Sequence, residues 1–496
     1  IPVGLMTSEI HNNHEIISEI VESNKFFFRD KSKILLFKQP QVPVISSNGE
    51  WLLQSSLKLH MRPGGHGAIW KQAADAGLLD AFSGMGVQKL FLRQINNPVA
   101  AVDYSALAFI GMGLQGDFQF GFASCLRRVG ASEGMNVLCN KDKEFWISNI
   151  EYTDFQKRGI KDQEKEKGSS YSCFPSNTNI LFVDLHTVSK SLKEKILFAP
   201  TINLKSFYEC YREGSYKKIN GGRVESMMQN LADEVKTSSQ DGLCPEKLNS
   251  FITFNRREKT ISVTKKQYQN KKEFADTPYS CFYDLYQSYH SLLENYCNFS
   301  VSEKISLEEF AEHSSPFYLY FHPALGPTFS IIGQKLREGE VSFGSYLQLE
   351  IAELELKRFH IDGALKINSG NPLGLSKEKR DSEGAYSSGP ACSLIDCVIR
   401  NRGVDRSKIT ERHAWEANAP LKEVLNITLK EGAEFEAKGI EFLGDINIEV
   451  PAFTKMVVLQ EGSELIFQTN SIKNPTWTWQ YHFDVADRLI LTKAHG

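Results

Sequence analysis

The sequence predicts an α/β fold with a doubly wound, mostly parallel sheet, followed by a C-terminal β-rich domain of the β-helix type. Up to about residue 235, apolar runs of strand length alternate with segments whose apolar residues recur at helical spacing, as in doubly wound sheets. In the last third, short stretches with apolar residues at every second position are separated by glycines. This second pattern favours stacked β arms, as in a β-helix, over the alternative of a β-sandwich.

The first region opens with strand and helix patterns in alternation. Residues 34–40 and 89–94 are apolar runs that end in polar residues, so both are predicted strands. Residues 10–27 and 70–82 carry apolar residues at helical spacing and are predicted helices. Residues 161–170, rich in Lys, Glu, Gly and Ser, are predicted to form a solvated loop.

A glycine-rich turn between the two predicted strands says most about ligands. Residues 61–70 place three glycines, at positions 64, 65 and 67, around His66. Glycine adopts positive φ and lets a flat ligand approach the backbone, so the expected ligand is a nucleobase or a phosphate. The alternative is that the segment is an ordinary turn that binds no ligand. Ligands of open α/β sheets lie beyond the carboxyl ends of strands, which is where Gln39, Asn96 and Asn97 fall.

The composition is that of a globular protein without a strong charge bias. The 496 residues are 41% apolar and 24% charged, and the net charge of −3 gives no electrostatic reason to expect a nucleic-acid partner. No apolar run approaches the length of a transmembrane segment. The nine cysteines form no CxxC pair, which favours a reducing compartment over a disulfide framework or a zinc site. Residues 1–9 read as a strand entering a turn, without an initiator methionine, so we expect an earlier segment in the natural protein.

Several motifs occur in the order found in one enzyme family. They are Met6-Thr7-Ser8, Phe37-Lys38-Gln39-Pro40, Pro63-Gly64-Gly65-His66-Gly67, Ile95-Asn96-Asn97-Pro98, Gly134-Met135-Asn136, Ile150-Glu151-Tyr152-Thr153, Asn177-Thr178-Asn179-Ile180 and His322-Pro323-Ala324-Leu325-Gly326-Pro327. With this ordered set the chain resembles the UDP-sugar pyrophosphorylases, and most closely the plastidial UDP-glucose pyrophosphorylases of plants.

The resemblance implies a domain organisation and an activity. Residues 1–235 would form a nucleotidyltransferase-like sheet, residues 236–345 the remainder of the catalytic region with variable insertions, and residues 346–496 the C-terminal β-rich domain. The implied reaction is uridylyl transfer, in which UTP and glucose 1-phosphate give UDP-glucose and pyrophosphate with Mg²⁺ as cofactor. The resemblance also implies a chloroplast location and a link to sulfolipid synthesis, and the C-terminal domain is the expected surface for protein partners.

Site residues follow from the same resemblance. The expected nucleotide-binding residues are Gln39, Gly64, Gly65, His66 and Asn97, the expected sugar-binding residues are Glu151, Asn179 and Glu225, and Asn96 occupies the position of the family's metal-binding aspartate. No catalytic residue is assigned. Ordinary alternatives are a strand-end surface residue for Gln39, a turn residue for His66, a turn or capping residue for Asn179 and a solvated helix residue for Glu225.

Two departures from the family leave a second function open. The amide oxygen of Asn96 is a poorer Mg²⁺ ligand than a carboxylate, and nothing in the sequence shows that Asp103 substitutes for it. The family's glycine-rich phosphate loop would lie before Ile1. Four basic residues either supply phosphate-binding charge or form a solvated loop: Arg256, Arg257, Lys265 and Lys266. The alternative to an active enzyme is therefore an inactive pyrophosphorylase-like protein, a binding or structural subunit of a larger assembly.

Overall fold

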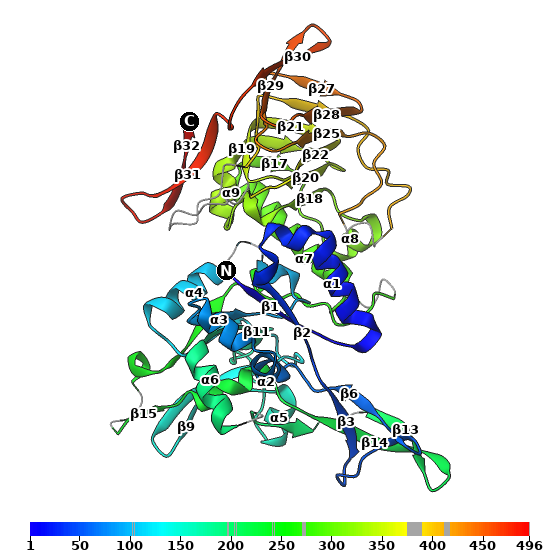
Figure 1. The fold of residues 1–496 in the computed structure, drawn as a ribbon, viewed down its shortest axis with the longest axis vertical. Helices are drawn as coiled ribbons and strands as arrows, with labels where there is room; N and C mark the ends of the chain where they lie inside the picture. Colours follow the sequence, from blue (N-terminus) through cyan, green and yellow to red (C-terminus); the bar gives the residue numbers. More distant parts are fainter. Residues whose placement is uncertain are drawn as a thin grey trace. The chain divides into compact units, whose positions relative to one another are not determined.

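A computed structural model of the chain describes residues 1–101, 103, 105–195, 198–202, 204, 206–240, 242, 244–269, 274–373, 389–410 and 417–495. The chain folds into two compact units (Figure 1). The first comprises Ile1–Gln94 and Ala106–Thr260, and the second Ile95–Ser105 and Ile261–Gly496. The first unit extends past residue 235 because strand β16 (Ser250–Asn255) pairs in parallel with β8 (Phe120–Cys125).

A seven-stranded mixed sheet forms the centre of the first unit. Its order is β15-β10-β9-β11-β8-β16, with β7 also paired to β11. β8 and β16 run parallel, whereas β11 runs antiparallel to both β7 and β8. The strand predicted at residues 89–94 is confirmed as β7. The remaining bounds are β7 (Lys89–Leu92), β9 (Met135–Lys141), β10 (Glu144–Ile150), β11 (Ser176–Asp184) and β15 (Thr237–Ser238).

Helices cover both faces of this sheet and confirm the α/β class. Leu181 of β11 belongs to a core cluster with Trp70 and Val188, whereas the next residue, Phe182, lies against Phe109 with 6.4 Å between ring centroids. Successive strand residues point to opposite faces, so α2 and α6 lie on one face and α4 on the other. The helices are α1 (Asn13–Ser23), α2 (Ala68–Asp75), α3 (Leu78–Gly84), α4 (Ser105–Gln115), α5 (Tyr152–Lys157) and α6 (Leu185–Glu194).

Two predicted helices differ in extent from the observed ones. The helix predicted over residues 70–82 forms as α2 and α3, because Gly77 between them adopts φ +70°, a left-handed conformation that ends α2. The helix predicted over residues 10–27 is confirmed but shorter, as α1. Residues 161–170 form a loop, as predicted.

Two smaller sheets carry the glycine turn. β1 (Val3–Thr7) and β2 (Ile34–Lys38) pair in parallel, and β2 confirms the strand predicted at residues 34–40. A five-stranded sheet extends as an arm of the first unit, seen at the lower right of Figure 1. Its strands are β3 (Gln41–Ser46), β6 (Met61–Pro63), β12 (Thr201–Ile202), β13 (Ser206–Arg212) and β14 (Ser215–Glu225), beside the hairpin β4 (Leu53–Ser55) and β5 (Lys58–Leu59). After β14 the chain enters the 3-10 helix η5 (Met228–Glu234).

The second unit contains a parallel β-helix, as the alternating pattern predicted. Figure 1 shows its strands stacked as successive rungs. One sheet holds β17 (Phe299–Val301), β19 (Leu336–Val341), β21 (Glu353–Asp362), β23 (Ala391–Ile395), β24 (Val398–Arg400), β26 (Glu434–Lys438), β27 (Glu441–Leu443), β29 (Thr454–Glu461) and β30 (Glu464–Ser471). The other holds β18 (Tyr318–Phe321), β20 (Tyr346–Glu350), β22 (Ala364–Ser369), β25 (Leu425–Leu429) and β28 (Ile446–Val450).

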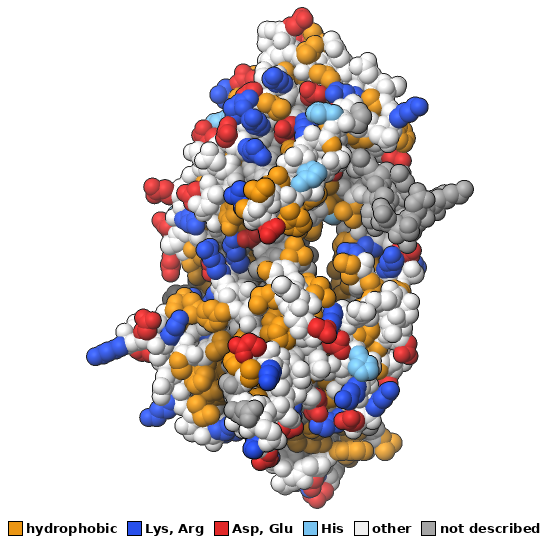
Figure 2. All heavy atoms as spheres, turned by 90° about the vertical axis from the view of Figure 1, so that its left-hand side faces the viewer, with side chains coloured by type: hydrophobic (Ala, Val, Ile, Leu, Met, Phe, Trp, Pro, Cys, Tyr) orange, Lys and Arg blue, Asp and Glu red, His pale blue; other side chains and the backbone are white. Residues whose placement is uncertain are grey.

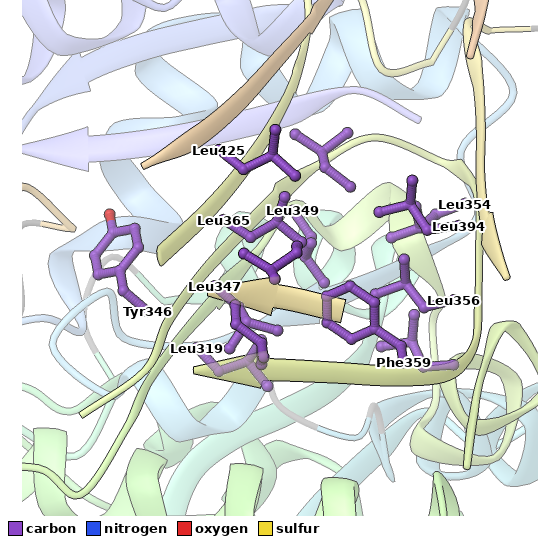
Figure 3. Packing of buried hydrophobic residues seen from close by; sticks show 14 of the residues in the cluster. Leu319, Tyr346, Leu347, Leu349, Leu354, Leu356, Phe359, Leu365, Leu394 and Leu425 are labelled. Carbon is purple, nitrogen blue, oxygen red and sulfur yellow. The ribbon is translucent and has the colours of Figure 1, made fainter. Parts of the chain in front are cut away.

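The interior of this β-helix is a column of aliphatic side chains (Figure 3). Leu347 pairs with Leu365, and Leu365 with Leu425, so equivalent positions of successive coils are in register. Leu354 and Leu394 approach from the other sheet, and all five side chains are at most 1% exposed. Parallel stacking in register lets every coil bury its apolar positions against the next.

Helices precede the β-helix and a hairpin follows it. The helices are α7 (Pro278–Ser291), α8 (Leu307–His313) and α9 (Phe329–Lys335), and the hairpin is β31 (Trp477–Phe483) with β32 (Leu489–His495). The indole Nε1 of Trp479 donates to the Leu354 carbonyl (3.0 Å), which ties the hairpin to β21. β30 pairs antiparallel with β29, unlike the parallel pairs before it.

The mixed surface charge agrees with the small net charge of the chain, and the free thiols agree with its scattered cysteines. Acidic and basic side chains are interspersed over the face shown in Figure 2, with hydrophobic side chains between them. All nine cysteines are free of disulfide bonds. In the part of the chain that the structure describes, each helix is too short or too polar to cross a membrane.

Candidate functional site

The nucleotide side of the candidate site is built where β2 ends. Gln39 follows β2, and its backbone N–H donates to the carbonyl of Thr7, the last residue of β1 (2.7 Å). Its side-chain Nε2 donates to the carbonyl oxygen of Gly65 (2.5 Å). The N–H of Gly64 donates to the Pro40 carbonyl (3.0 Å). Gln39 and the glycine turn, 26 residues apart in sequence, therefore meet in one place.

Gly65 is required by its backbone conformation and by its neighbours. Its φ of +84° is rarely adopted by residues other than glycine. A Cβ atom at this position would lie 2.8 Å from the Cβ of Glu225 and 2.9 Å from the carbonyl oxygen of Ser226. The N–H of Gly67 donates to the same carbonyl (2.9 Å), so the turn packs directly on the end of β14.

Glu225 lies against this turn. It is the last residue of β14, it is 5% exposed, and its Oε2 lies 2.6 Å from Nη2 of Arg223. The alternative of a solvated helix residue is therefore wrong, because a strand carries Glu225 into a buried position. Its role toward a sugar stays a prediction.

His66 is held in one tautomer beside the turn. Its Nδ1 accepts a hydrogen bond from the N–H of Met228 (3.1 Å). A neutral imidazole that accepts at Nδ1 carries its hydrogen on Nε2. The carbonyl of Met228 accepts from Nε1 of Trp70 (2.9 Å), so η5 and α2 fix the ring together. The histidine of the turn is thus a donor at Nε2.

Glu151, a predicted sugar-binding residue, follows β10 and is contacted by Asn149. Nδ2 of Asn149 donates to Oε1 of Glu151 (3.0 Å), and Asn149 is 8% exposed. Asn136 of β9 pairs opposite Asn149, and its Nδ2 donates to Oγ of Ser124 at the end of β8 (2.6 Å). Of this facing pair, Asn149 is therefore the side chain that contacts Glu151, whereas Asn136 is bonded to Ser124.

Asn179 occupies a bulge in β11. The register with β8 shifts between Asn177 and Leu181, and Asn179 adopts φ +58°. Its Oδ1 accepts from Nδ2 of Asn177 (2.9 Å), and its own Nδ2 donates to Oε1 of Gln94 (3.4 Å). Bulges redirect side chains and are frequent beside active sites. Asn179 is therefore a strand residue turned out of its ladder, which neither ordinary alternative describes.

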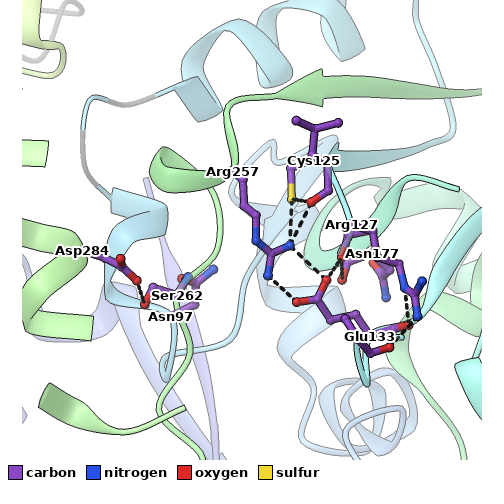
Figure 4. Close-up of polar contacts among 11 residues, drawn as sticks. Asn97, Cys125, Arg127, Glu133, Asn177, Arg257, Ser262 and Asp284 are labelled. Carbon is purple, nitrogen blue, oxygen red and sulfur yellow. Dashed lines mark hydrogen bonds and ion pairs between the residues drawn. The ribbon is translucent and has the colours of Figure 1, made fainter. Parts of the chain in front are cut away.

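A half-buried ion pair joins this polar cluster to Arg257, which follows β16, and the sequence did not predict it (Figure 4). Arg257 contacts both carboxylate oxygens of Glu133 and donates to the Leu126 carbonyl (2.9 Å), while Oγ of Ser176 donates to Glu133 (2.8 Å). Burial alone would raise the pKa of Glu133, but the hydrogen bonds and charge of Arg257 hold this pKa below its ordinary value. Burial raises the pKa of the neighbouring Cys125 thiol to about 12. Because Glu133 neutralises Arg257, this arginine is a poor candidate for phosphate binding.

Asn96 and Asn97 belong to the second unit. Nδ2 of Asn96 donates to the Thr264 carbonyl (3.2 Å), whereas its buried Oδ1 has no hydrogen-bond partner among the described residues. Oδ1 of Asn97 accepts from the N–H of Ser262 (3.0 Å), and Asn97 is buried. Figure 4 includes this second contact together with the bond from Ser262 Oγ to Asp284 (2.5 Å).

The fit of Mg²⁺ depends on the oxygen atoms near Asn96. Mg²⁺ is usually held by one or two carboxylates together with substrate phosphates. Asn96 offers one neutral oxygen, and the carboxylate of Asp103 already accepts from the N–H of Phe329 (2.9 Å). No group of three or more His, Cys, Asp or Glu side chains among the described residues could hold a metal ion. The described residues therefore offer no preformed cluster of three or more ligands for a metal ion, and Mg²⁺ binding stays a prediction.

Lys265 and Lys266 are better placed than Arg257 to offer free positive charge. Both are exposed, and neither forms an ion pair with another described residue. The N–H of Thr264 donates to the carbonyl of Asn96 (2.8 Å), which fixes the start of this basic pair in the second unit.

Comparisons with known proteins show which families two parts of the chain resemble. Residues 1–213 match the family described as UTP–glucose-1-phosphate uridylyltransferase, and residues 336–494 match the family described as UGP3-like, C-terminal hexapeptide repeats. The chain is 34% identical over 505 positions to UTP–glucose-1-phosphate uridylyltransferase 3, chloroplastic, of Arabidopsis thaliana, with 97% of this chain and 57% of that protein covered. It is 24% identical over 264 positions to a UDP-sugar pyrophosphorylase of Oryza sativa subsp. japonica, with 51% and 41% covered.

One solved structure supports the fold. A protein of Entamoeba histolytica described as a UDP-N-acetylglucosamine pyrophosphorylase superposes with a TM-score of 0.51 at 18% identity, covering 71% of this chain and 78% of that one. The chain spans about half the length of the curated relatives above. Residues 1–213 are thus similar to the UTP–glucose-1-phosphate uridylyltransferase family, and residues 336–494 are similar to the UGP3-like hexapeptide repeats.

Proposed function

We propose that the full-length protein is a UTP:glucose-1-phosphate uridylyltransferase, which forms UDP-glucose and pyrophosphate. The observation that carries this proposal is the bond between the side chain of Gln39 and the carbonyl of Gly65, at the end of a parallel strand pair in a region that is similar to this family. The name of the Arabidopsis relative supports glucose as the sugar.

The uracil ring would lie at the Gly65 turn. Uracil presents an N–H donor between two carbonyl acceptors along one edge. Nε2 of Gln39 donates to the carbonyl of Gly65, which fixes the orientation of the amide and leaves its Oε1 as the acceptor for the uracil N–H. The N–H of Gly65, which donates to no other described residue, would meet a uracil carbonyl. His66, a donor at Nε2, would lie beside the nucleotide.

The sugar would lie beside Glu151, which follows β10, and Asn179 in the bulge of β11. Glu151 keeps one carboxylate oxygen beyond the bond from Asn149, and this oxygen would accept from a sugar hydroxyl. Asn179, turned out of β11 by its bulge, would contact the same ring. Glu225 would contribute from the end of β14, beside the glycine turn.

The reaction needs two anions brought together and their charge offset. An oxygen of the sugar phosphate forms a bond to the α-phosphorus of UTP, and the bond from that phosphorus to the bridging oxygen breaks, releasing pyrophosphate. Positioning accounts for most of such catalysis. We propose that Mg²⁺ enters on the phosphates of UTP, because Mg²⁺ is commonly held by substrate phosphates together with one or two protein groups. Asn97 of the second unit stays a proposed nucleotide contact.

The wider setting is also a proposal. The Arabidopsis relative is named as chloroplastic, and we extend that location to this protein. Supply of UDP-glucose to sulfolipid synthesis and protein partners at the β-helix complete the proposal.

The test is pyrophosphate release and UDP-glucose formation by the full-length protein with UTP, glucose 1-phosphate and Mg²⁺. Gln39→Ala removes the proposed uracil acceptor and one support of the turn, so we expect uridine affinity to fall about tenfold, the value of one or two hydrogen bonds. Affinity for glucose 1-phosphate should change less than about twofold. The matched control is Gln41→Ala, which removes an exposed amide two residues away in β3.

Two outcomes would count against this proposal. Equal losses of uridine and sugar affinity in Gln39→Ala would contradict the assigned role of Gln39. UTP binding without turnover in the full-length protein would contradict the enzyme and favour a binding subunit.

A further inference from the structure

We propose that Asn149 is a positioning residue for this transfer, which orients the Glu151 carboxylate toward the sugar. This inference rests on the proposed function and extends it, because it names a residue that orients a side chain of the proposed sugar-binding region. Neither residue type nor spacing marks Asn149 in the sequence, and the assignment comes from its contacts.

Asn149 fixes one oxygen of Glu151 and leaves the other for the ligand. Its Nδ2 donates to Oε1 of Glu151 (3.0 Å). Its Oδ1 is buried and has no hydrogen-bond partner among the described residues. A flipped amide would bring this oxygen against the carboxylate, so Glu151 itself determines the orientation of Asn149. The side chain is 8% exposed, which restricts its rotation.

Gly134 provides the space that Asn149 occupies. A Cβ atom at residue 134 would overlap Oδ1 of Asn149 and lie 3.1 Å from its Cγ and Nδ2. Gly134 does not have positive φ, so glycine is required here for space and not for its backbone conformation. A side chain at residue 134 would displace the Asn149 amide and release Glu151.

Gly134 is in turn held from both sides. The carbonyl of Gly134 accepts from the N–H of Asn177 (2.9 Å), and Glu133 before it is held by Arg257. The side chain of Asn177 donates to Asn179 (2.9 Å). The two predicted sugar-binding residues, Glu151 and Asn179, are therefore linked through one glycine to the same half-buried ion pair.

The chemistry favours a ligand rich in hydroxyl donors. The remaining oxygen of Glu151 is an acceptor, and a carboxylate held at one oxygen cannot turn away from the ring. Hydrogen bonds to charged groups are stronger than neutral ones, so a misdirected Glu151 loses sugar affinity rather than uridine affinity.

The test compares Asn149→Ala with Asn136→Ala in the full-length protein. Asn136 is a matched control, because it lies opposite Asn149, is 3% exposed and also has an unpaired Oδ1, yet it bonds to Ser124 and not to Glu151. For Asn149→Ala we expect the KM for glucose 1-phosphate to rise about tenfold and the KM for UTP to change less than about twofold. For Asn136→Ala both values should stay within about twofold of the natural protein.

A pH profile separates positioning from a structural effect. Asn149→Asp places two carboxylates in hydrogen-bond contact, and such a pair shares one proton as the pH falls. The protonated carboxyl would donate to its partner and restore the orientation. As the pH is lowered from about 8 to about 5.5, we expect the KM of Asn149→Asp for glucose 1-phosphate to fall back toward that of the natural protein. The ratio of the KM of Asn149→Ala to that of the natural protein should not change over this range.

Binding distinguishes failure of this inference from failure of the proposed function. The probes are UDP-glucose and UDP, measured by calorimetry without turnover. A smaller difference between their affinities in Asn149→Ala, with an unchanged affinity for UDP, supports the positioning role even if the protein does not turn over. Equal effects of Asn149→Ala and Asn136→Ala on that difference, or a natural protein that binds UDP-glucose no better than UDP, would overturn the inference.

Discussion

Replacing Arg257 by methionine should destabilise the first unit by about 3 kcal/mol, because it leaves the Glu133 carboxylate buried without its partner. Arg257 contacts both oxygens of Glu133, and the two side chains are only 22% and 18% exposed. Breaking a buried ion pair costs about 3–5 kcal/mol, and we expect the lower end because each side chain keeps some contact with solvent.

The pH dependence follows from the lowered pKa of Glu133. Burial alone would raise that pKa, but Arg257 holds it below the ordinary value of 4.5. A carboxylate with a lowered pKa in the folded state stabilises the fold above its unfolded pKa, and this contribution is lost as the pH falls through the folded pKa. Arg257→Met removes the largest contributions that lower the pKa of Glu133 and leaves the bond from Ser176 and the charge of Arg127, so this pKa should rise relative to its value in the natural protein. The stability difference between this variant and the natural protein should therefore shrink on acidification.

The assay is urea unfolding at several pH values, followed by tryptophan fluorescence, to which both units contribute. Glu133→Gln is the matched variant, and the double variant should recover part of the loss, since it leaves no buried charge. The reasoning would be refuted if Arg257→Met unfolded at the same urea concentration as the natural protein while its UTP affinity fell about tenfold. That result would make Arg257 a phosphate ligand.

Three further variants test other parts of the structure. Gly65→Ala should weaken uridine-nucleotide binding at least about tenfold, because a Cβ atom would press on Glu225. Gly77→Ala is the control: Gly77 has φ +70° but open space around it, so the variant should lose only about 1 kcal/mol of stability and bind nucleotide normally. Binding is measured by calorimetry and stability by thermal unfolding. Burial lowers the pKa of Lys335 to about 8 from 10.5, and its Nζ donates to the Ala352 carbonyl (2.8 Å). The unfolded chain then binds more protons between these values, so stability should rise from pH 8 to pH 10.5, and Lys335→Met should flatten that rise in chemical denaturation.

The fold was largely predictable because its signals are local. Alternating apolar residues predicted the β-helix, since each of its strands has one buried face, as Leu347 and Leu365 show. The apolar run that ends before Gln39 predicted strand β2. The helix over residues 70–82 was predicted as one piece because Gly77 is compatible with a helical pattern, and only the packed structure gives it positive φ.

The site was predictable only in part. The end of a strand predicted Gln39 as a site residue, and the glycine turn predicted Gly65. In the structure these two residues are joined by a hydrogen bond. The pairing of Glu133 with Arg257 joins residues 124 positions apart and has no local pattern. The fit of Asn149 against Gly134 is a packing relation between two strands, which one sequence does not encode visibly.

The last hairpin of the β-helix has a consequence for association between molecules. Stacked coils of this type expose a strand edge that could template endless fibre growth. Because β30 reverses direction against β29, another chain would meet an edge of the wrong polarity for a further parallel coil. The side chains from Gln468 to Ser471 at this edge are polar and exposed, which further discourages a dry contact. The hairpin thus acts as a terminator that keeps a repetitive architecture finite on this sheet.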